Sequence, residues 1–309
     1  MNNIPLFSIA IPTFNRLEYF KLALNSALAQ TYQNVEIVIL DNASSDGTQA
    51  YLNDVITQHS NITVIRNDEN IGFARNIMQI PQYIKGKYLT VLSDDDLLMP
   101  TFVELAVSSM ETSENIALWY CRTQLIDASG ANLRLTPDYS TKVEEGADFI
   151  RDIIVCKKIN PYWCSVVYRV KNLITIGGFV NVGNALDFAA NCCVASQGMV
   201  VFNKKTLSFY RSYDTNLTRK THFFEWFESE YAAFQHIQKH YFFPIKMADK
   251  FFSRVLVSRL NKIKCLELFD MLSYGVHRYG VGVYFWFFIY LPRFFVKIFL
   301  LKIGFWNAR

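Results

Sequence analysis

Three consecutive aspartates, Asp94, Asp95 and Asp96, are the residues best suited to chemistry in this sequence. They follow Ser93 and an apolar run at residues 88–92. Three adjacent carboxylates repel one another, so all three stay ionised only beside a cation. Mg²⁺ and Mn²⁺ prefer oxygen ligands of this kind and can also bind a diphosphate. The run therefore predicts a divalent-metal site. The competing interpretation is a solvated turn that caps a helix beginning near Leu97.

Other polar segments also follow apolar runs. Asp41 ends such a run, and its carboxylate could accept hydrogen bonds from a base or a ribose, whereas residues 44–46 suit the cap of the next helix. Arg75 could meet a phosphate or a ribose, or be an ordinary residue at a helix start. No G-x-G-x-x-G or G-K-[ST] loop is present, which disfavours dinucleotide and P-loop enzymes. A further segment could surround a base edge: Pro12, Thr13, Phe14, Asn15 and Arg16.

Strands and helices that alternate over the first hundred residues would bring these polar segments to one edge. Alternation of this kind predicts an α/β fold with a Rossmann-like, mostly parallel sheet and helices on both faces. Ligands of such sheets bind beyond the carboxyl ends of the strands, where all the polar segments above fall. We expect strands at residues 7–11, 35–40, 62–65 and 88–92, and helices at 16–30, 48–56 and 72–83.

The second hundred residues have a weaker pattern. They predict a turn at Gly177-Gly178, and the chain beyond residue 222 has a helical pattern. The expected strands are 117–121, 163–168, 200–202 and 207–211, and the expected helices are 144–155 and 186–196.

Taken in order, these segments resemble the inverting family 2 glycosyltransferases of the GT-A fold. The similarity rests on residues 12–16, on Asp-x-x-Ser-x-Asp-Gly-Thr at 41–48, on Asn-x-Gly and Arg-Asn within 70–76, and on the acidic run. It covers residues 5–105 closely and extends more loosely to about residue 218. One departure is that Ser93 stands where many members carry the first carboxylate.

The resemblance implies transfer of a sugar from a nucleotide-diphosphate donor with inversion at the anomeric carbon. It implies Mn²⁺ or Mg²⁺ at Asp95 and Asp96, with Asp94 assisting at the nucleotide. It also implies a general base after a Gly-Gly turn at a helix start, which is Asp187 here. The apolar surroundings of Asp187 predict a raised pKa, while a first-turn helix aspartate is the alternative reading.

Two further segments are candidates for substrate contacts. Trp163 could stack on a sugar ring or belong to the core. Arg211 could pair with a phosphate, in a segment where the family often keeps Arg-x-His. Tyr213 occupies the position of that histidine, which puts metal ligation from this segment in doubt.

The end of the chain is basic and aromatic. Residues 239–309 hold 12 Lys and Arg against 3 Asp and Glu, whereas the rest holds 19 against 24. Lys246, Lys250 and Arg254 share one helical face. The uncharged stretch 281–292 is shorter than the ~20 residues of a bilayer span. We expect a helical region lying on an anionic membrane surface. A membrane hairpin and a dimer interface, and hence a homo-oligomer, are the alternatives.

Compartment and metal content can be inferred from the cysteines and the start of the chain. The six cysteines include no C-x-x-C pair and have no histidine at ligand spacing, so we expect reduced thiols and no structural zinc site. The first residues lack the features of a signal peptide. These observations predict a cytoplasmic protein, peripheral on the inner face of the cell membrane.

The sequence thus predicts a GT-A domain at residues 1–220, with a nucleotide-binding half at 1–105 and an acceptor half at 106–220. A membrane-associating region follows at 221–309. The expected function is sugar transfer to a lipid-linked oligosaccharide in surface polysaccharide or O-antigen biosynthesis. A sugar-phosphate nucleotidyltransferase is the alternative. A nucleic-acid-binding protein is a weaker one because the body is acidic, and no nucleic-acid partner is expected.

Overall fold

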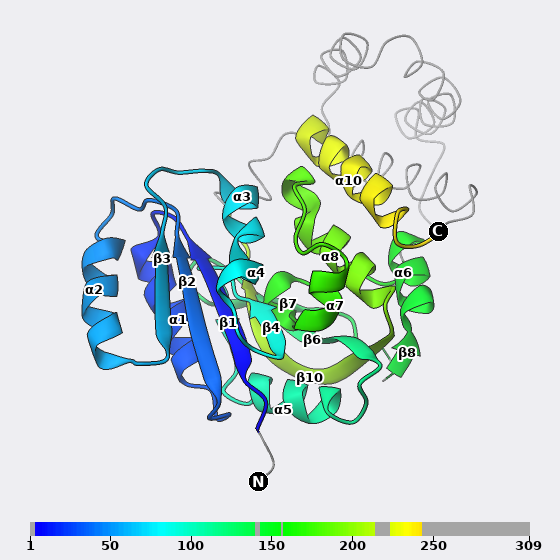
Figure 1. Cartoon of the computed structure of the whole chain (residues 1–309), viewed down its shortest axis with the longest axis horizontal. Coiled ribbons are helices and arrows are strands. Elements are labelled where there is room, and N and C mark those ends of the chain that lie inside the picture. The colour runs from blue at the N-terminus through cyan, green and yellow to red at the C-terminus, as the bar shows by residue number, and fades with distance from the viewer. Residues whose placement is uncertain (1–3, 140–142, 156, 214–222, 243–309) are drawn as a thin grey trace, which may run out of the picture. The chain divides into compact units, whose positions relative to one another are not determined.

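The structure is a computed structural model, and it describes residues 4–139, 143–155, 157–213 and 223–242. Expectations about residues 243–309, including Lys246, Lys250 and Arg254, lie outside these residues. The described strands form one sheet in the order β3-β2-β1-β4-β9-β6-β10-β5, with β7 beside β6 and β8 beside β10 (Figure 1). No helix in the described part is long and apolar enough to cross a membrane.

The first half of the sheet is parallel, as the alternating pattern predicts. Strands β1, β2, β3 and β4 pair in parallel because a helix connects each to the next. The elements are β1 (Phe7–Thr13), α1 (Leu17–Leu28), β2 (Val35–Asp41), α2 (Thr48–Gln58), β3 (Ile62–Arg66), α3 (Phe73–Met78), α4 (Ile80–Tyr83) and β4 (Tyr88–Val91).

Two prolines change the expected boundaries. Strand β1 continues through Pro12. Proline has no N–H to donate, but β4 pairs with β1 only as far as Ala10, so no hydrogen bond between β1 and β4 is lost at Pro12. The single helix expected at 72–83 is instead two short helices. They meet at Gln79, just before Pro81, whose ring cannot continue a regular helix.

The second half of the sheet is mixed, which corrects the expectation of a mostly parallel sheet. Four of its strands, β5, β7, β8 and β9, pair antiparallel with their neighbours. The elements are β5 (Leu97–Leu98), α5 (Phe102–Met110), β6 (Ile116–Ile126), β7 (Asn132–Leu135), β8 (Val143–Glu145), α6 (Gly146–Ile154), a 3-10 turn (Trp163–Ser165), β9 (Val166–Arg169), α7 (Val170–Thr175), a 3-10 turn (Gly183–Ala185), α8 (Leu186–Ala195), β10 (Met199–Arg211) and α10 (Phe223–Ile237).

Four other expected elements differ from the structure. The expected strands 200–202 and 207–211 are one strand, β10, which passes a register irregularity between Asn203 and Thr206. The start of the helix expected at 144–155 belongs to β8. The helix expected near Leu97 begins only at Phe102, because Leu97 and Leu98 pair with β10 instead.

The strand directions bring four chain segments to one edge. Strand β9 runs antiparallel to both β4 and β6, so β6 runs parallel to β4, and β10 runs parallel to β6. The carboxyl ends of β1, β2, β4 and β10 therefore point the same way. Residues after Thr13, Asp41, Val91 and Tyr210 emerge at this edge, which is where the candidate site forms.

Helices cover both faces of the sheet (Figure 1). Along β6, Trp119 packs on Phe102 of α5 at 5.4 Å between ring centroids, while the next residue, Tyr120, packs on Phe149 of α6 at 5.6 Å. Successive side chains of a strand point to opposite faces, so α5 and α6 lie on opposite sides. Helices α1, α2 and α5 share one core cluster with β1 and β2. Helix α10 packs against α8.

Candidate active site

Asp94 lies at the carboxyl end of β4 and is held by the end of β1. Its Oδ2 accepts hydrogen bonds from the Thr13 hydroxyl at 3.0 Å and the Phe14 N–H at 3.3 Å. Its Oδ1 accepts one from the Arg16 guanidinium at 3.1 Å. Burial raises the pKa of Asp94 to about 6, against the Arg16 charge that lowers it, and the Asp95 charge raises it further. Asp94 thus joins the acidic run to residues 13–16.

Asp95 is the second carboxylate of the cluster, and two donors share one of its oxygens. Its Oδ2 accepts hydrogen bonds from Arg16 at 2.8 Å and from the Tyr213 hydroxyl at 2.9 Å. The Tyr213 ring lies 5.5 Å from the ring of Tyr19 on α1. The sequence aligned Tyr213 with a histidine of the family and named no hydrogen-bond partner for it. The structure shows that its phenol reaches the acidic run.

Asp96 points into the interior and is almost completely buried. Its Oδ1 accepts a hydrogen bond from the Arg211 backbone N–H at 2.9 Å. Within the described residues, its buried Oδ2 has no N–H or O–H donor, although the weakly donating Cys164 thiol acts on the carboxyl. Burial, and next the charge of Asp95, raise the pKa of Asp96 well above its usual value.

The Arg211 side chain is buried and holds the loops around the cluster. Its Nε donates to the Asp95 carbonyl at 2.9 Å, and Nη1 donates to the carbonyls of Asp127 and Ala128 at 3.1 Å each. The guanidinium also lies 4.8 Å from the centroid of the Tyr19 ring. These contacts support a positioning role for Arg211, and its contact with a diphosphate stays a prediction.

The acidic cluster has the donor set that a divalent cation requires. Three buried or nearly buried carboxylates meet there, and Arg16 is the cation that pairs with two of them. The unpartnered Oδ2 of Asp96 and the raised pKa of Asp94 both indicate negative charge that the described residues leave incompletely compensated. Helix capping does not account for the run, since α5 begins six residues after Asp96. Hard oxygen donors of this kind fit Mg²⁺ or Mn²⁺.

The loop after β1 is fastened to the loop after β2. Asn15 adopts a left-handed backbone (φ 51°), its N–H donates to the Ser44 hydroxyl at 3.0 Å, and its side chain accepts from the Ser45 N–H at 2.7 Å. Asp46 accepts from the N–H groups of Leu17 and Thr48, so one carboxylate connects the starts of α1 and α2. The N-cap of α2 is Gly47 and none of residues 44–46, although Asp46, one residue earlier, accepts from the first N–H of the helix. These hydrogen bonds also fix residues 12–16, with Phe14 partly exposed.

The two remaining nucleotide-site candidates differ in exposure. Asp41 is fully buried and forms an ion pair with Arg66, and its Oδ1 accepts a hydrogen bond from the Ser44 N–H at 3.0 Å. Arg66 lies opposite Asp41 in the register of β2 and β3, so the sequence missed a partner that only strand order supplies. Arg75 is exposed on α3 and forms no ion pair with a described residue.

Asp187 stands in the first turn of α8, as predicted, and a chain of hydrogen bonds positions it. Its Oδ2 accepts from Asn160 Nδ2 at 3.0 Å, the Asn160 oxygen accepts from Asn191 at 2.9 Å, and the Asn191 oxygen accepts from the Tyr168 hydroxyl at 2.6 Å. Burial raises the pKa of Asp187 to about 7, as does the Glu230 charge, whereas the Phe188 N–H and Asn160 lower it. A half-ionised carboxyl near neutral pH suits a general base.

The segment before Asp187 combines a glycine turn with aromatic side chains. Gly177 and Gly178 have φ values of 89° and 80°, which favour glycine, and they end the α7 segment. Trp163 is half-buried against Phe179 at 5.2 Å and lies in a 3-10 turn, not at the start of a strand. Its contact with a sugar stays a prediction.

Tyr162 lies within electrostatic reach of both halves of the site. Burial raises the pKa of its phenol, as do the charges of Asp96 and Asp187. Its ring stacks on Tyr210 at 4.2 Å. The charges of Asp96 and Asp187, which are 91 residues apart in the chain, thus both act on the Tyr162 phenol.

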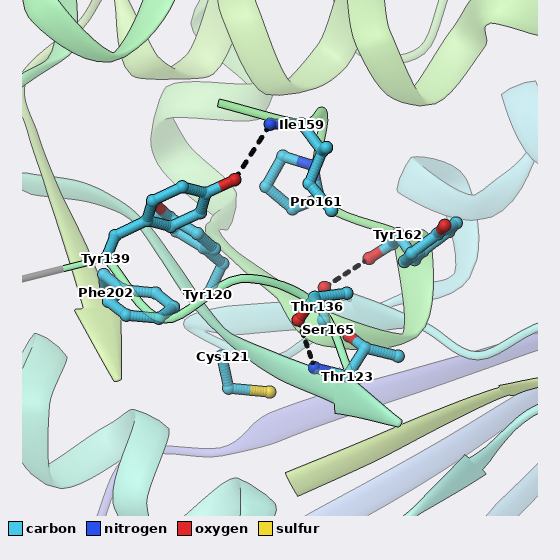
Figure 2. A pocket seen from close by; sticks show the side chains of 10 residues that line it. All are labelled: Tyr120, Cys121, Thr123, Thr136, Tyr139, Ile159, Pro161, Tyr162, Ser165 and Phe202. Atoms are coloured by element: carbon cyan, nitrogen blue, oxygen red, sulfur yellow. Dashed lines mark hydrogen bonds between the residues drawn. The ribbon is translucent and has the colours of Figure 1, made fainter. Parts of the chain in front are cut away.

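A small pocket opens beside this segment (Figure 2). The rings of Tyr120, Tyr139 and Phe202 gather on one side, and the ring of Tyr162 stands apart on the other. The Tyr139 hydroxyl accepts a hydrogen bond from the Ile159 N–H at 2.9 Å. None of the residues that line the pocket is acidic, so it is separate from the aspartate cluster.

The sequence family and the fold can be compared with known proteins. The family described as Glycosyl transferase family 2 matches residues 8–167. The chain therefore belongs to glycosyl transferase family 2, which confirms the resemblance predicted from the motifs. An uncharacterized glycosyltransferase of Haemophilus influenzae is 29% identical over 116 residues, 38% of this chain and 36% of that protein. Chondroitin synthase of Escherichia coli is 29% identical over 189 residues, 61% of this chain and 26% of that protein.

Solved structures show the same fold. The structure of S. aureus TarS residues 1–349 superposes with a TM-score of 0.66 at 17% identity, over 85% of this chain and 77% of that one. A mannosyltransferase of Pyrobaculum calidifontis, solved with GDP-Man and Mn²⁺, gives a TM-score of 0.59 at 14% identity, over 96% and 87% of the two chains. These likenesses show a mixed α/β fold of the GT-A type. The chain matches only about a third or less of the length of the two curated relatives named above.

Proposed function

We propose that this chain transfers a sugar from a nucleotide-diphosphate donor to a saccharide hydroxyl, with inversion at the anomeric carbon. The observation that carries the proposal is the convergence of Asp94, Asp95 and Asp96 with Arg16 where β1 and β4 end. Relatives of the same fold have been solved with UDP-GlcNAc and with GDP-Man. Family membership disfavours the nucleotidyltransferase and nucleic-acid-binding alternatives.

In this proposal Asp95 and Asp96 would hold Mn²⁺ or Mg²⁺, and Asp94 would assist from the nucleotide side. The ion would supply Lewis-acid charge that offsets the charge on the leaving diphosphate. Thr13 and Arg16 fix Asp94 and Asp95, so the carboxylates are oriented before substrate arrives. The exposed Arg75 is available to a phosphate or ribose.

Asp187 acts as the general base. Its carboxylate takes the proton of the acceptor hydroxyl while the acceptor oxygen bonds to the anomeric carbon. The bond between that carbon and the diphosphate oxygen breaks, and the nucleoside diphosphate leaves with the electron pair. Asn160 donates to Oδ2 and holds the carboxyl in place during this step. Trp163 would offer its half-exposed face to a sugar ring.

A lipid-linked oligosaccharide is the acceptor that best matches the rest of the sequence. The basic, aromatic residues 239–309 would keep the enzyme on the anionic inner face of the cell membrane, as surface polysaccharide or O-antigen synthesis requires. Full-length protein should therefore bind vesicles containing phosphatidylglycerol in low salt and release them in high salt. Equal binding to neutral vesicles, or none, would exclude this part of the proposal.

Donor binding and metal use can be tested together by thermal shift. Full-length protein is heated with UDP-, CDP-, GDP- and dTDP-sugars, each with and without Mn²⁺. We expect sugars of one base to raise the Tm, and to raise it more with Mn²⁺. An Asp95→Asn, Asp96→Asn double variant should lose the Mn²⁺-dependent part. A folded protein that responds to none of these donors would contradict the proposed function, and a response without Mn²⁺ dependence would remove the metal from it.

A further inference from the structure

A cysteine and two histidines outside the proposed active site lie together where α8 meets α10. Cys193 belongs to α8, His236 to α10, and His240 follows directly after α10. The Cys193 Sγ and one ring nitrogen of each histidine lie within 4.8 Å of one another. We propose that these three side chains bind a divalent transition metal, with Zn²⁺ as the best-suited ion.

The ligand chemistry differs from that of the aspartate cluster. One thiolate and two imidazoles suit Zn²⁺ and Co²⁺, whereas carboxylates suit Mg²⁺ and Mn²⁺. Zn–S and Zn–N bonds of about 2.3 and 2.0 Å place the ligand atoms of a tetrahedral site roughly 3.5 Å apart. Small side-chain rotations would close the observed cluster to that size. Three protein ligands leave the fourth position for water or another group.

One histidine nitrogen needs a partner that the described residues do not supply. The Nε2 of His236 is buried and has no hydrogen-bond partner among them. Buried polar atoms without partners are rare in folded proteins, and a bound ion is one of the recognised ways in which such an atom is satisfied. The rings of His236 and His240 lie 5.0 Å apart. Both side chains are therefore already gathered on the side that Cys193 occupies.

The charge states also fit metal binding. Burial, and then the charges of His240 and Lys239, lower the pKa of His236, which keeps it in the neutral form that binds metals. Burial raises the pKa of Cys193 to about 12, so its thiol stays protonated unless a cation replaces the proton. Metal binding at this site should accordingly release a proton.

Residue spacing alone did not reveal this site, and the sequence predicted no structural zinc. Cys193 and His236 are 43 residues apart, and only the packing of α10 on α8 brings them together. The histidines are four residues apart, but α10 ends at Ile237, so His236 lies on the helix and His240 lies in the turn that follows it. A bound metal would cross-link α10 to the helix that carries Asp187, six residues or about 9 Å along α8 from Cys193.

The test is cobalt spectroscopy on the full-length protein after removal of metals with a chelator. We expect one Co²⁺ per chain, a thiolate-to-cobalt charge-transfer band in the near ultraviolet, visible bands of tetrahedral cobalt, and loss of all these on adding Zn²⁺. Cys193→Ala should abolish the charge-transfer band and weaken Zn²⁺ binding by more than about 100-fold, which exceeds the usual effect of changing a residue that only hydrogen-bonds to a metal ligand. The matched control is Cys192→Ala, the neighbouring buried thiol of the same helix, which should keep the band.

Several results would refute the proposal that these three residues bind a metal. These are a folded full-length protein without the charge-transfer band, a band that persists in Cys193→Ala, or a band lost equally in Cys192→Ala. If Cys193→Ala does not fold, His240→Gln is the second test, because His240 is partly exposed. This variant should weaken Zn²⁺ binding to the same extent. An unchanged Zn²⁺ affinity of His240→Gln would refute the proposed metal site. The Asp95→Asn, Asp96→Asn variant should keep the band, so this test and that of the proposed function fail independently.

Discussion

Asp187→Asn should abolish sugar transfer while leaving donor binding unchanged. The substitution keeps the size of the side chain and removes the group that would accept the acceptor proton. A positioned general base contributes about 10²–10⁴-fold to a rate, so we expect transfer to fall by that factor. The hydrogen bonds and ion pairs that the described residues of the loops at 12–16 and 41–48 form do not involve Asp187, which is held by Asn160 and the Phe188 N–H. The dissociation constant of the donor should therefore stay at its wild-type value.

The pH dependence of the wild-type enzyme follows from the same residue. A base works in its deprotonated form, so activity is lost as the pH falls through the pKa of Asp187, which is about 7. A group of that pKa is about one-tenth ionised at pH 6 and about nine-tenths ionised at pH 8. The ratio kcat/KM should accordingly rise roughly tenfold between these values and then level off.

Asn160→Ala should move the acid limb of this profile, the pH range in which kcat/KM rises, to higher pH. The Asn160 amide donates to Oδ2 and favours the ionised carboxyl, so its loss raises the pKa of Asp187. A hydrogen bond to a charged group is worth about 1.5 kcal/mol at the lower end, and about 1.4 kcal/mol corresponds to one pKa unit. The limb should shift to near pH 8, which costs about fivefold in activity at pH 7 and little at pH 9. Glu230 raises the same pKa, so Glu230→Gln should shift the limb the other way.

Initial rates of transfer from a radiolabelled donor, measured from about pH 5 to about pH 10, report both effects, and calorimetry reports donor affinity. Asp54→Asn, the same chemical change at an exposed position of α2, is the matched control and should behave as wild type. Full activity of Asp187→Asn would refute the assignment. So would an acid limb near pH 6 that Asn160→Ala leaves in place, because that limb would follow the pKa of Asp94.

Two other substitutions test the packing around the site. Arg16→Met removes the cation shared by Asp94 and Asp95. We expect the free energy of unfolding to fall by about 1–3 kcal/mol, and Mn²⁺ to raise the Tm of the variant more than that of the wild type. Equal Mn²⁺ responses would contradict a shared cation position. Gly146→Ala would put a Cβ 1.7 Å from the carbonyl oxygen of Ala195. It should cost about 3 kcal/mol in urea unfolding, and a loss below about 1 kcal/mol would contradict the steric argument.

The first hundred residues could be predicted from the sequence because their information is local. The run at 35–40, which is apolar apart from the half-buried Glu36, gives a largely buried strand, and Asp41 ends it as expected. The order of strand and helix then implies parallel pairing, which puts residues 12–16 and 94–96 at one edge. Helix α8 was also predicted, together with the first-turn place of Asp187.

The second hundred residues were harder to predict because their key strand pairings are non-local. Arg169 looks like an ordinary basic residue at a strand end, yet it is fully buried, and its guanidinium donates to the carbonyls of Met110, Ser113 and Ile116. Such a position depends on β9 running between β4 and β6, which no local pattern encodes. The approach of Tyr213 to Asp95 depends in the same way on β10 running parallel to β6.

The hydrogen bonds of each aspartate help to distinguish the roles of Asp94, Asp95 and Asp96, which the sequence left open. Asp94 is bound by residues 13–16 and Asp96 by the Arg211 backbone, so each has at least one oxygen committed to the protein. Asp95 lies between them, both its donors share Oδ2, and Oδ1 accepts no hydrogen bond within the described residues. The oxygens without a conventional donor are therefore Asp95 Oδ1 and Asp96 Oδ2. That pattern supports the proposal that Asp95 and Asp96 are the metal ligands and that Asp94, held by Thr13 and Arg16, lies on the nucleotide side of the site.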